Sequence, residues 1–568
     1  MAYIKETSSI CPECLQQISA TIYEDEKDNN IYMKKTCPEH GDFKDIIAGS
    51  TYYYLWRRGY HHDSLETPLD RETGFNNGPF SQYGGKQGLK GCPYDCGLCE
   101  NHKSASCICL IDITNRCNLK CPICFANAAV TGYVVEPTLE EIETIMAHFR
   151  ETKPMPPVAL QISGGEPTIR NDLPEIVQMS KDMGFQHRMV TTNGLRFTNI
   201  DYLQEIIDAG MNAMYWQFDG LERETWIKTR GVDLLDKKMK VVENCRELGY
   251  KDVVLVPTIA RGVNDHEVGN IMDFAIQNND VVSCVVFQPV SLCGRITQQE
   301  VLQMRYNTTD LFDDINKHSS PNMDANLFGR RFYPIPTLSH FVKLVTWFDD
   351  VEPFEMTSHE DCGFATIGIV ERNKDPKKNK MRAIDDYFNI NAAVADADRL
   401  WSFLKDTGLE NKRPFFSRLF GAISPTIGKA IGDAMDSAGH FLIRKAFKYG
   451  FLANTMRHLE FKDPKNLLDT LVKFSRIVLN PGWQSAASFL NTNALLVSCM
   501  HFQDAFNMNV ERVSRCLVHY GVFMRDPNQP GGGKVYRVPF CAMNTLHRPI
   551  LEKRNAELQT QHAEVTLE

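Results

Sequence analysis

The sequence predicts an α/β protein built around an incomplete barrel of six β/α units. A cysteine-rich segment precedes the barrel, and a mainly helical C-terminal domain follows it. Three observations lead to this prediction. Short apolar runs alternate with amphipathic stretches between about residues 107 and 294, most of the cysteines lie in the first quarter of the chain, and the alternation stops near residue 295. A chain of 568 residues is long enough for several domains.

Six apolar runs predict the strands of the barrel, and the stretches between them predict helices. Strands that alternate with helices form parallel βαβ units, whose chemistry lies at the carboxyl ends of the strands. The predicted strands are Ile108–Thr114, Val158–Ile162, His187–Thr191, Ala213–Phe218, Val253–Thr258 and Ser283–Gln288. The predicted helices are Leu139–Arg150, Leu173–Met183, Tyr202–Ala209, Leu234–Leu248 and Glu267–Asn278, with Asp396–Asp406 and Pro464–Val478 beyond the barrel.

Composition and charge exclude several classes of protein. The net charge of −9 gives no basic surface for nucleic acid. The chain turns polar directly after Met1, and it has no run of about 18 apolar residues, so we expect neither a signal peptide nor a membrane span. We therefore expect a cytoplasmic protein, in which 18 cysteines are better explained by metal binding than by disulfides.

A group of three cysteines follows the first predicted strand. In Cys117-Asn-Leu-Lys-Cys121-Pro-Ile-Cys124 the thiolates can hold three irons of a [4Fe–4S] cluster and leave the fourth iron open. The amino and carboxylate groups of S-adenosylmethionine (SAM) suit that open iron, and electron transfer to the sulfonium would release a 5′-deoxyadenosyl radical. A zinc site with three cysteines and one histidine is the alternative.

Polar groups at the ends of the next strands are candidates for binding SAM. The turn Gly164-Gly165-Glu166 ends the second strand, and glycines there let the backbone approach a ligand. Asn193, Gln217 and Asp219 follow the third and fourth strands. Each of these groups has an alternative role in an ordinary turn or a helix cap. Arg261, Asn264 and Gln288 are further candidates on the same rim.

With these motifs, residues 107–290 resemble the radical SAM superfamily and its Cys-x3-Cys-x-aromatic-Cys signature. Ile123 stands where the superfamily usually has an aromatic residue, and Phe125 lies just beyond the last cysteine. The resemblance implies a [4Fe–4S] cluster held by Cys117, Cys121 and Cys124, SAM as a cofactor, and an electron donor such as ferredoxin or flavodoxin.

Two further cysteine groups lie before the barrel. Cys11-Pro-Glu-Cys14 and Cys37-Pro-Glu-His40 resemble the knuckles of a rubredoxin or zinc ribbon and predict one zinc or iron ion. Cys92, Cys96 and Cys99 repeat the three-cysteine spacing, and Cys107 is a candidate fourth ligand. A fully ligated cluster there would relay electrons or anchor the fold. Cys109, Cys245, Cys284 and Cys293 fit packing roles.

Over nearly its full length the chain resembles one branch of the superfamily, in the CPEC…CPEHG, GCPYDCGLC, TNRCNLKCPICFANA and C-terminal HFQD…ERVSRC motifs. This branch contains archaeal tetraether lipid synthases and 7,8-dihydro-6-hydroxymethylpterin dimethyltransferases. The resemblance implies a further cluster held by Cys362, Cys499, Cys516 and Cys541. His519 and Cys293 are rivals of Cys499 as the fourth ligand.

Two reactions follow from this resemblance. We favour carbon–carbon coupling of isoprenoid lipid chain ends, because the apolar segment Phe416–Phe447 suits a lipid and the extra cysteine groups exceed what methyl transfer requires. A lipid substrate implies peripheral contact with a membrane. The alternative is radical methylation of a dihydropterin, for which Asp504, Asn507 and Glu511 are candidate pocket residues. A non-enzymatic zinc scaffold is a third hypothesis, but it leaves the barrel motifs unexplained.

These observations give the predicted domain organisation. The segments are a rubredoxin-like or zinc-ribbon-like metal segment (1–50), an auxiliary iron–sulfur segment (51–106), the barrel (107–294), a helical domain with an auxiliary cluster (295–552) and a disordered tail (553–568).

Overall fold

The computed structural model describes residues 2–61, 82–83, 86–87, 91–96, 98–99, 101–126, 128, 131–291, 298–318, 331–348, 355–409, 427–458, 494–526 and 530–565. Two compact units make up the chain. The first contains Met1–Pro336, Thr357–Arg382 and Asn493–Glu568, and the second contains Thr337–Met356 and Ala383–Thr492.

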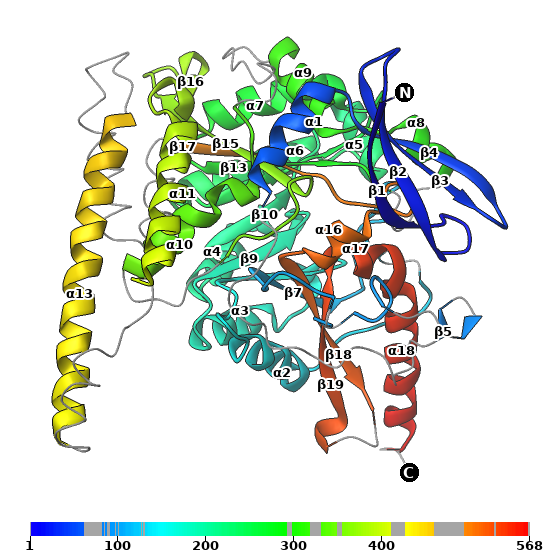
Figure 1. Cartoon of the computed structure of the whole chain (residues 1–568). Helices are drawn as coiled ribbons and strands as arrows, with labels where there is room; N and C mark the ends of the chain where they lie inside the picture. Colours follow the sequence, from blue (N-terminus) through cyan, green and yellow to red (C-terminus); the bar gives the residue numbers. More distant parts are fainter. Residues whose placement is uncertain are drawn as a thin grey trace. The chain divides into compact units, whose positions relative to one another are not determined.

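The six predicted barrel strands are present and pair in parallel in sequence order, which confirms the α/β barrel (Figure 1). They are β7 (Ile108–Thr114), β8 (Ala159–Gly164), β9 (His187–Thr192), β10 (Ala213–Gln217), β11 (Val253–Val256) and β13 (Val282–Pro289). A two-residue strand, β12 (Thr258–Ile259), continues beside the end of β13.

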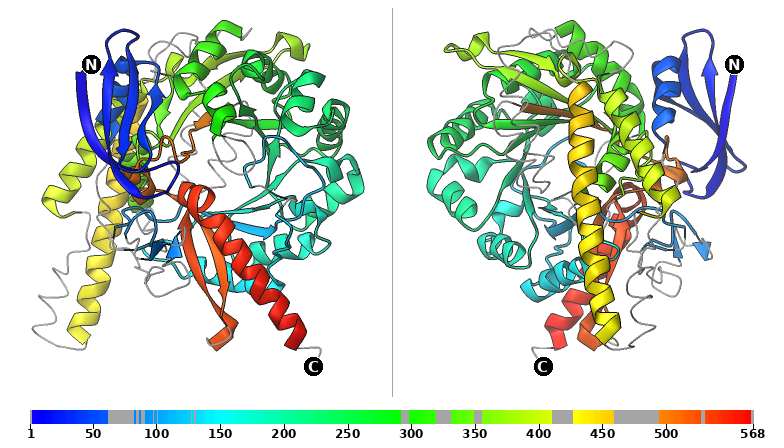
Figure 2. Two further views of the ribbon diagram at one scale, coloured as in Figure 1. Left: turned by 90° about the vertical axis from the view of Figure 1, so that its right-hand side faces the viewer. Right: turned by 60° about the vertical axis from the view of Figure 1, so that its left-hand side comes forward.

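Helices lie along the outer face of this curved sheet (Figure 2). Their apolar faces and the outward residues of the strands form one continuous core. Helix α2 shows why these segments are helical. Thr138 and Glu141 form a capping box at its start, while Ile142, Ile145 and Phe149 line its buried face. The helices are α2 (Leu139–Arg150), α3 (Leu173–Asp182), α4 (Ile200–Asp208), α5 (Arg223–Arg230), α6 (Leu235–Glu247) and α7 (Val268–Gln277).

Strands from the C-terminal third extend both edges of the barrel sheet. Strand β17 (Ala494–Met500) pairs in parallel with β13, and β18 (Val518–Arg525) pairs in parallel with β7. The remaining strands of this sheet are β14 (Tyr333–Pro334), β15 (Gly363–Glu371), β16 (Lys380–Ala383) and β19 (Gly533–Pro539). The mainly helical C-terminal region therefore also contributes strands, which satisfy the free hydrogen-bonding groups at the barrel edges.

The N-terminal segment is an antiparallel sheet of four strands. They are β1 (Ala2–Ile10), β2 (Gln17–Asp25), β3 (Asn30–Cys37) and β4 (Gly41–Ala48), followed by α1 (Thr51–Arg57). Ile22, Ile31 and Met33 form a small core with Tyr54 of α1. The turn after β1 carries Cys11 and Cys14, whereas the tight turn between β3 and β4 carries His40. Strands β5 (Gln82–Tyr83) and β6 (Lys86–Gln87) form a separate hairpin.

The second unit is helical. Its helices α10 (Ser339–Phe348), α11 (Ile390–Thr407) and α13 (Ile427–Thr455) pack around a core that includes Trp347 and Trp401. The predicted helix Asp396–Asp406 lies within α11. Residues 427–447 of the apolar segment Phe416–Phe447 belong to the single long helix α13. The rest of that segment, and the predicted helix Pro464–Val478, lie outside the described residues.

The remaining helices belong to the first unit. They are α8 (Gln298–Gln303), α9 (Thr308–His318), α16 (Val510–Ser514), α17 (Phe540–Ala542) and α18 (Arg548–Val565). Helix α18 corrects the prediction of a disordered tail from residue 553, because Asn555 and Ala556 are buried in the fold. Among the described helices, none has both the length and the apolar character needed to cross a bilayer.

Candidate cluster and cofactor site

The three cysteines after β7 lie on one loop and are close enough to interact electrostatically. Burial raises the pKa of Cys117 to about 12, and it also raises the pKa of Cys121. These two free thiols are therefore protonated at neutral pH, and cluster binding must release their protons. Three partly buried thiols on a single loop are a donor set that fits a cluster with one open iron.

A cleft of about 530 Å³ opens beside this loop. Its volume lies within the range of small-molecule sites. Asn115 shapes one wall, because its side chain donates to the Tyr133 carbonyl oxygen at 3.0 Å and accepts from the Val135 N–H at 2.9 Å. The lining residues are Asn115, Arg116, Cys117, Asn118, Thr131, Gly132, Tyr133, Val134 and Ile169.

The two glycines of the turn after β8 allow a close backbone approach to the cysteine loop. A Cβ atom on Gly164 would lie 2.1 Å from the Thr114 carbonyl oxygen, and one on Gly165 would lie 2.1 Å from that of Arg116. The N–H of Gly165 donates to Thr114 at 2.7 Å, and that of Glu166 donates to Arg116 at 2.9 Å. These two amides therefore hold the start of the cysteine loop.

Glu166 is buried and connects the turn after β8 to the end of β9 through hydrogen bonds. Its carboxylate accepts hydrogen bonds from the Thr192 hydroxyl at 2.8 Å and from the Asn193 N–H at 2.7 Å. Burial raises the pKa of Glu166, and these hydrogen bonds oppose that effect. The Asn193 side chain in turn donates to Asn118 of the cysteine loop at 2.7 Å. Asn193 thus links the third strand to the cleft.

Asp219 is fully buried and pairs with Arg230, a residue that the sequence analysis did not select. The guanidinium donates to both carboxylate oxygens, at 2.5 and 2.8 Å. Gln217 donates to Asp219 at 2.6 Å, and the Thr258 N–H donates at 3.1 Å. Although burial alone would raise the pKa of Asp219, Arg230 holds it below its usual value. No local sequence pattern identifies Arg230, which is one of many charged residues on α5.

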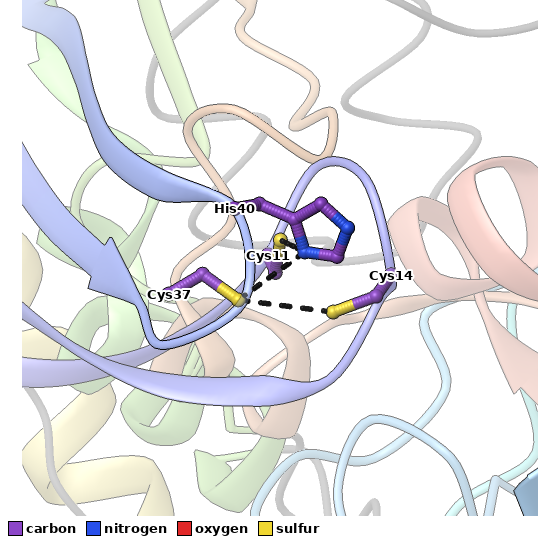
Figure 3. A group of neighbouring side chains, drawn as sticks. All are labelled: Cys11, Cys14, Cys37 and His40. Atoms are coloured by element: carbon purple, nitrogen blue, oxygen red, sulfur yellow. Dashed lines mark hydrogen bonds between the residues drawn. The ribbon is translucent and has the colours of Figure 1, made fainter.

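Cys11, Cys14, Cys37 and His40 form a group of four potential metal ligands whose ligand atoms all lie within 4.8 Å of one another (Figure 3). The sulfur atoms of Cys14 and Cys37 are 3.9 Å apart, and the His40 Nδ1 atom lies 3.5 Å from Cys37 and 3.7 Å from Cys11. A tetrahedral ion with metal–sulfur bonds of about 2.3 Å requires sulfur–sulfur distances of about 3.8 Å and sulfur–nitrogen distances of about 3.6 Å. The donor set therefore fits a single tetrahedral ion.

The second cysteine group also lies together. Cys92, Cys96 and Cys99 interact electrostatically, and the His547 Nε2 atom lies 3.2 Å from the Cys96 sulfur. Cys107 lies beside a different segment, because its N–H donates to the Leu517 carbonyl oxygen at 2.8 Å. Like Arg230, His547 lies at a candidate site but could not be selected from the sequence, because 451 positions separate it from Cys96.

The C-terminal cysteines divide into three that meet and one that does not. Cys362, Cys516 and Cys541 interact electrostatically with one another, and Arg512 hydrogen-bonds to Cys362. Cys499 instead lies in the apolar barrel core, 3.7 Å from the Thr308 hydroxyl. His519 bonds to Ser106 at 3.0 Å and contacts His102. Cys293 lies outside the described residues.

The other residues considered in the sequence have structural partners. Asp504 pairs with Arg305 at 2.7 Å, and Glu511 pairs with Lys5 at 2.8 Å. Asn507 accepts a hydrogen bond from the Asp504 N–H at 2.9 Å. The expected packing cysteines Cys109, Cys245 and Cys284 are buried. Arg261 pairs with Asp310, Asn264 bonds to the Asp219 carbonyl oxygen, and Gln288 donates to the Tyr215 hydroxyl.

Comparison with known proteins agrees with this architecture. Residues 111–275 match the model of the radical SAM superfamily, and residues 3–49 match an HMPTM N-terminal zinc ribbon domain. The chain is 36% identical over 550 residues to the 7,8-dihydro-6-hydroxymethylpterin dimethyltransferase of Methanocaldococcus jannaschii. That alignment covers 97% of this chain and 95% of the relative. The chain is a member of the radical SAM superfamily. Within it, the chain belongs to the same family as the M. jannaschii protein.

Other radical SAM relatives match only part of the chain. A probable GTP 3′,8-cyclase of Methanothermobacter marburgensis is 29% identical over 194 residues, which are 34% of this chain and 62% of the relative. Among solved structures, methylornithine synthase PylB has a TM-score of 0.31 at 18% identity and covers 39% of this chain and 64% of its own. Streptococcus suis SuiB bound to SAM has a TM-score of 0.31 at 18% identity, with 38% and 47% covered. Membership of the radical SAM superfamily makes the chain an enzyme that uses a [4Fe–4S] cluster and SAM.

Proposed function

We propose that this radical SAM enzyme methylates a dihydropterin, with the radical cluster held by Cys117, Cys121 and Cys124. The full-length similarity to the M. jannaschii dimethyltransferase carries this proposal. It favours the pterin alternative of the sequence analysis over lipid coupling. When bound, the cluster supplies an electron that cleaves SAM to a 5′-deoxyadenosyl radical.

The residues around the cleft have separate tasks in this proposal. The cleft beside Cys117 receives SAM, and Asn118, fixed by Asn193, lies on its wall. Gly164, Gly165 and Glu166 keep the cysteine loop in place through backbone and carboxylate hydrogen bonds. Gln217 and Asp219 act on the loop indirectly. Gln217 donates a hydrogen bond to Asp219, and Asp219 holds Arg230 at the loop.

Neutral polar side chains inside the barrel support a heterocyclic substrate. Ile162, Val190 and Trp216 face the helices, so the alternate residues of the same strands face the barrel interior. These interior residues include two hydrogen-bonded pairs, Gln161 with Thr191 and Tyr215 with Gln288, each at 2.8 Å. All four are partly exposed. Amide and hydroxyl groups of this kind can pair with the edge of a neutral pterin ring.

The remaining metal sites complete the proposal. The tetrahedral set Cys11, Cys14, Cys37 and His40 would hold one zinc or iron ion. Cys92, Cys96 and Cys99 would hold an auxiliary [4Fe–4S] cluster, and Cys362, Cys516 and Cys541 a second. Such clusters can pass electrons from an external donor of the ferredoxin or flavodoxin class.

One observation favours the lipid reaction as a second candidate. Helix α13 exposes three large apolar side chains, Phe441, Leu442 and Tyr449, which are 53%, 65% and 59% accessible. Most soluble proteins cover such groups or use them to meet an apolar partner. An isoprenoid chain or a membrane surface would provide one.

The deciding experiment is an anaerobic reaction of the reconstituted enzyme with SAM, a reductant and either a dihydropterin or an archaeol-type lipid. Mass spectrometry should show 5′-deoxyadenosine and a pterin heavier by one CH2 unit per methyl group. A lipid that loses a pair of hydrogens for each new bond would refute pterin methylation and establish lipid coupling. Tyr215→Phe and Gln288→Leu should raise the KM for the pterin while SAM cleavage persists. Cys117→Ala, the negative control, should abolish SAM cleavage.

A further inference from the structure

Arg230 connects the end of α5 to the loop that carries the radical-cluster cysteines. Its Nη1 atom donates to the carbonyl oxygen of Ile123 at 2.9 Å, between Cys121 and Cys124. The neighbouring backbone makes a second connection, because the Ile123 N–H donates to the Thr229 carbonyl oxygen at 3.4 Å. The backbone N–H and carbonyl group of Ile123 therefore both fix the cysteine loop to the end of α5.

The chain turns away directly after this contact. Gly231 ends α5 with a φ of +80°, and its ideal Cβ position would be 3.5 Å from Pro122. A left-handed conformation at this position favours glycine. The Cys121–Cys124 turn therefore packs closely against the end of α5.

The guanidinium is also a buried positive charge beside the thiols. Only 8% of Arg230 is accessible, and Asp219 receives two of its hydrogen bonds. It further hydrogen-bonds to the Cys121 thiol. Asp219 pairs with the guanidinium through two oxygens, and an arginine side chain stays charged in proteins.

A permanent charge in this position has a chemical consequence. Reduction adds one negative charge to a cluster, and a nearby buried cation stabilises that charge more strongly than water-exposed cations do. Hydrogen bonds to the sulfur ligands and nearby charges are among the protein features that set the reduction potential of a cluster. Arg230 supplies both, with a hydrogen bond to Cys121 and a charge that interacts with Cys121 and Cys124.

We propose that Arg230 is a positioning residue for the radical cluster, which fixes the Cys121–Cys124 turn and raises the reduction potential of the cluster. Asp219 orients the guanidinium, so both ends of the contact are buried and fixed. This inference rests on the proposed cluster ligands Cys117, Cys121 and Cys124, but it is independent of the substrate. It gives Asp219 a role in orienting Arg230 in place of the direct SAM contact that the sequence suggested.

The test is a redox titration of the reconstituted enzyme, followed by electron paramagnetic resonance. The signal that changes when SAM is added, and that is lost in Cys117→Ala, reports the radical cluster. In Arg230→Met the ratio of reduced to oxidised radical cluster at a fixed potential should fall at least tenfold, a shift of 59 mV for a one-electron couple. Arg230→Lys keeps the charge and should restore most of this ratio.

Controls separate the possible outcomes. Arg223 lies on the same helix, but its side chain is 54% exposed and pairs with Asp233 and Asp236, so Arg223→Met should titrate like the parent. Equal potentials in the parent and Arg230→Met would overturn the proposal, as would equal shifts in the Met and Lys variants. Cys121→Ala tests the ligand assignment separately, because it should remove the SAM-dependent signal. If it does not, the ligand set is wrong whatever Arg230 does.

Discussion

The ammonium group of Lys35 donates a hydrogen bond of 2.7 Å to the carbonyl oxygen of Ala505, although 470 positions separate the two residues. The same group bonds to Ser9 and Ile10 of the N-terminal sheet, at 3.0 and 2.8 Å. Nearby, Arg305 forms ion pairs of 2.8 Å with Asp45 and 2.7 Å with Asp504. The N-terminal sheet, which carries the candidate metal ligands, is therefore attached to the segment that leads to Cys516.

Replacing Lys35 should loosen this attachment. Lys35→Met leaves two buried carbonyl oxygens without a donor, each at a cost of about 1–3 kcal/mol. We expect a lower unfolding temperature and faster proteolysis within residues 2–50. Lys34 is exposed on the same strand, so Lys34→Met is the matched control. Equal cleavage rates in the two variants would contradict a role for Lys35 in holding the sheet.

The contribution of Lys35 should also depend on pH. Burial lowers the pKa of Lys35 from 10.5 to about 8. Between about pH 8 and 10.5 the unfolded chain therefore binds a proton that the folded chain does not, and linkage makes this contribution to stability rise with pH. The difference in unfolding free energy between the parent and Lys35→Met should widen across this window, by about 3 kcal/mol at most. Denaturant titrations at pH 7.5, 9 and 10.5 measure it, and a constant difference would refute the lowered pKa.

Gly165 should not tolerate a side chain. A Cβ atom there would overlap the backbone of Arg116, which cannot move without displacing the cysteine loop. We expect Gly165→Ala to cost about 3 kcal/mol or more and to remove the SAM-dependent paramagnetic signal. Gly59 has open space around its Cβ position, so Gly59→Ala should keep both stability and signal. Normal cluster loading in Gly165→Ala would show that the loop can shift.

The N-terminal donor set should account for one metal ion per chain. Cys14→Ser removes one of four ligands, and elemental analysis should show one zinc or iron ion fewer than in the parent. Protection of residues 2–50 from protease should fall with the metal, because ligand binding and local folding are coupled. Cys245→Ala, in the buried face of α6, should leave the metal content unchanged. An unchanged metal count in Cys14→Ser would exclude the site.

Cys499 and Cys516 should respond differently to removal. Cys516 lies near Cys362 and Cys541, so Cys516→Ala should lower the iron content by as much as one cluster. Cys499 lies in the core, and Cys499→Ala should keep all the iron while it loses about 1 kcal/mol of stability. Iron assays and visible spectra of the two variants give the answer. Iron loss in Cys499→Ala would instead show that Cys499 is a cluster ligand.

Local patterns in the sequence were sufficient for the barrel but not for its edges. The strands β7 to β13 and helices such as α2 agree closely with the predicted ranges, because alternation and amphipathic periodicity are local properties. The pairing of β18 with β7 joins residues about 400 positions apart, and no periodicity records such a partner. The C-terminal strands were therefore missed, although Ala494–Met500 is an apolar run.

The candidate site shows the same limit. The cysteines and the glycine turn were found because their spacing is itself the signal. Arg230, His547 and Arg512 have no spacing signal, since each acquires its role only when distant segments meet. The position of Cys499 beside Thr308 also depends on tertiary contacts, which neither its spacing nor the resemblance records.

The pairing of β17 with β13 and of β18 with β7 sets the order in which this enzyme can mature during synthesis. A ribosome that has released the chain to the end of β13 has produced a sheet with two open parallel edges, β13 and β7. Those edges remain open until more than 200 further residues emerge, and open edges attract other chains. The proposed cluster ligands Cys117, Cys121 and Cys124 are made early, whereas both edges of the barrel sheet are paired only after Arg525 has been made. The segment that matches the superfamily model and the stretch needed for a fully paired barrel sheet are therefore different parts of this chain.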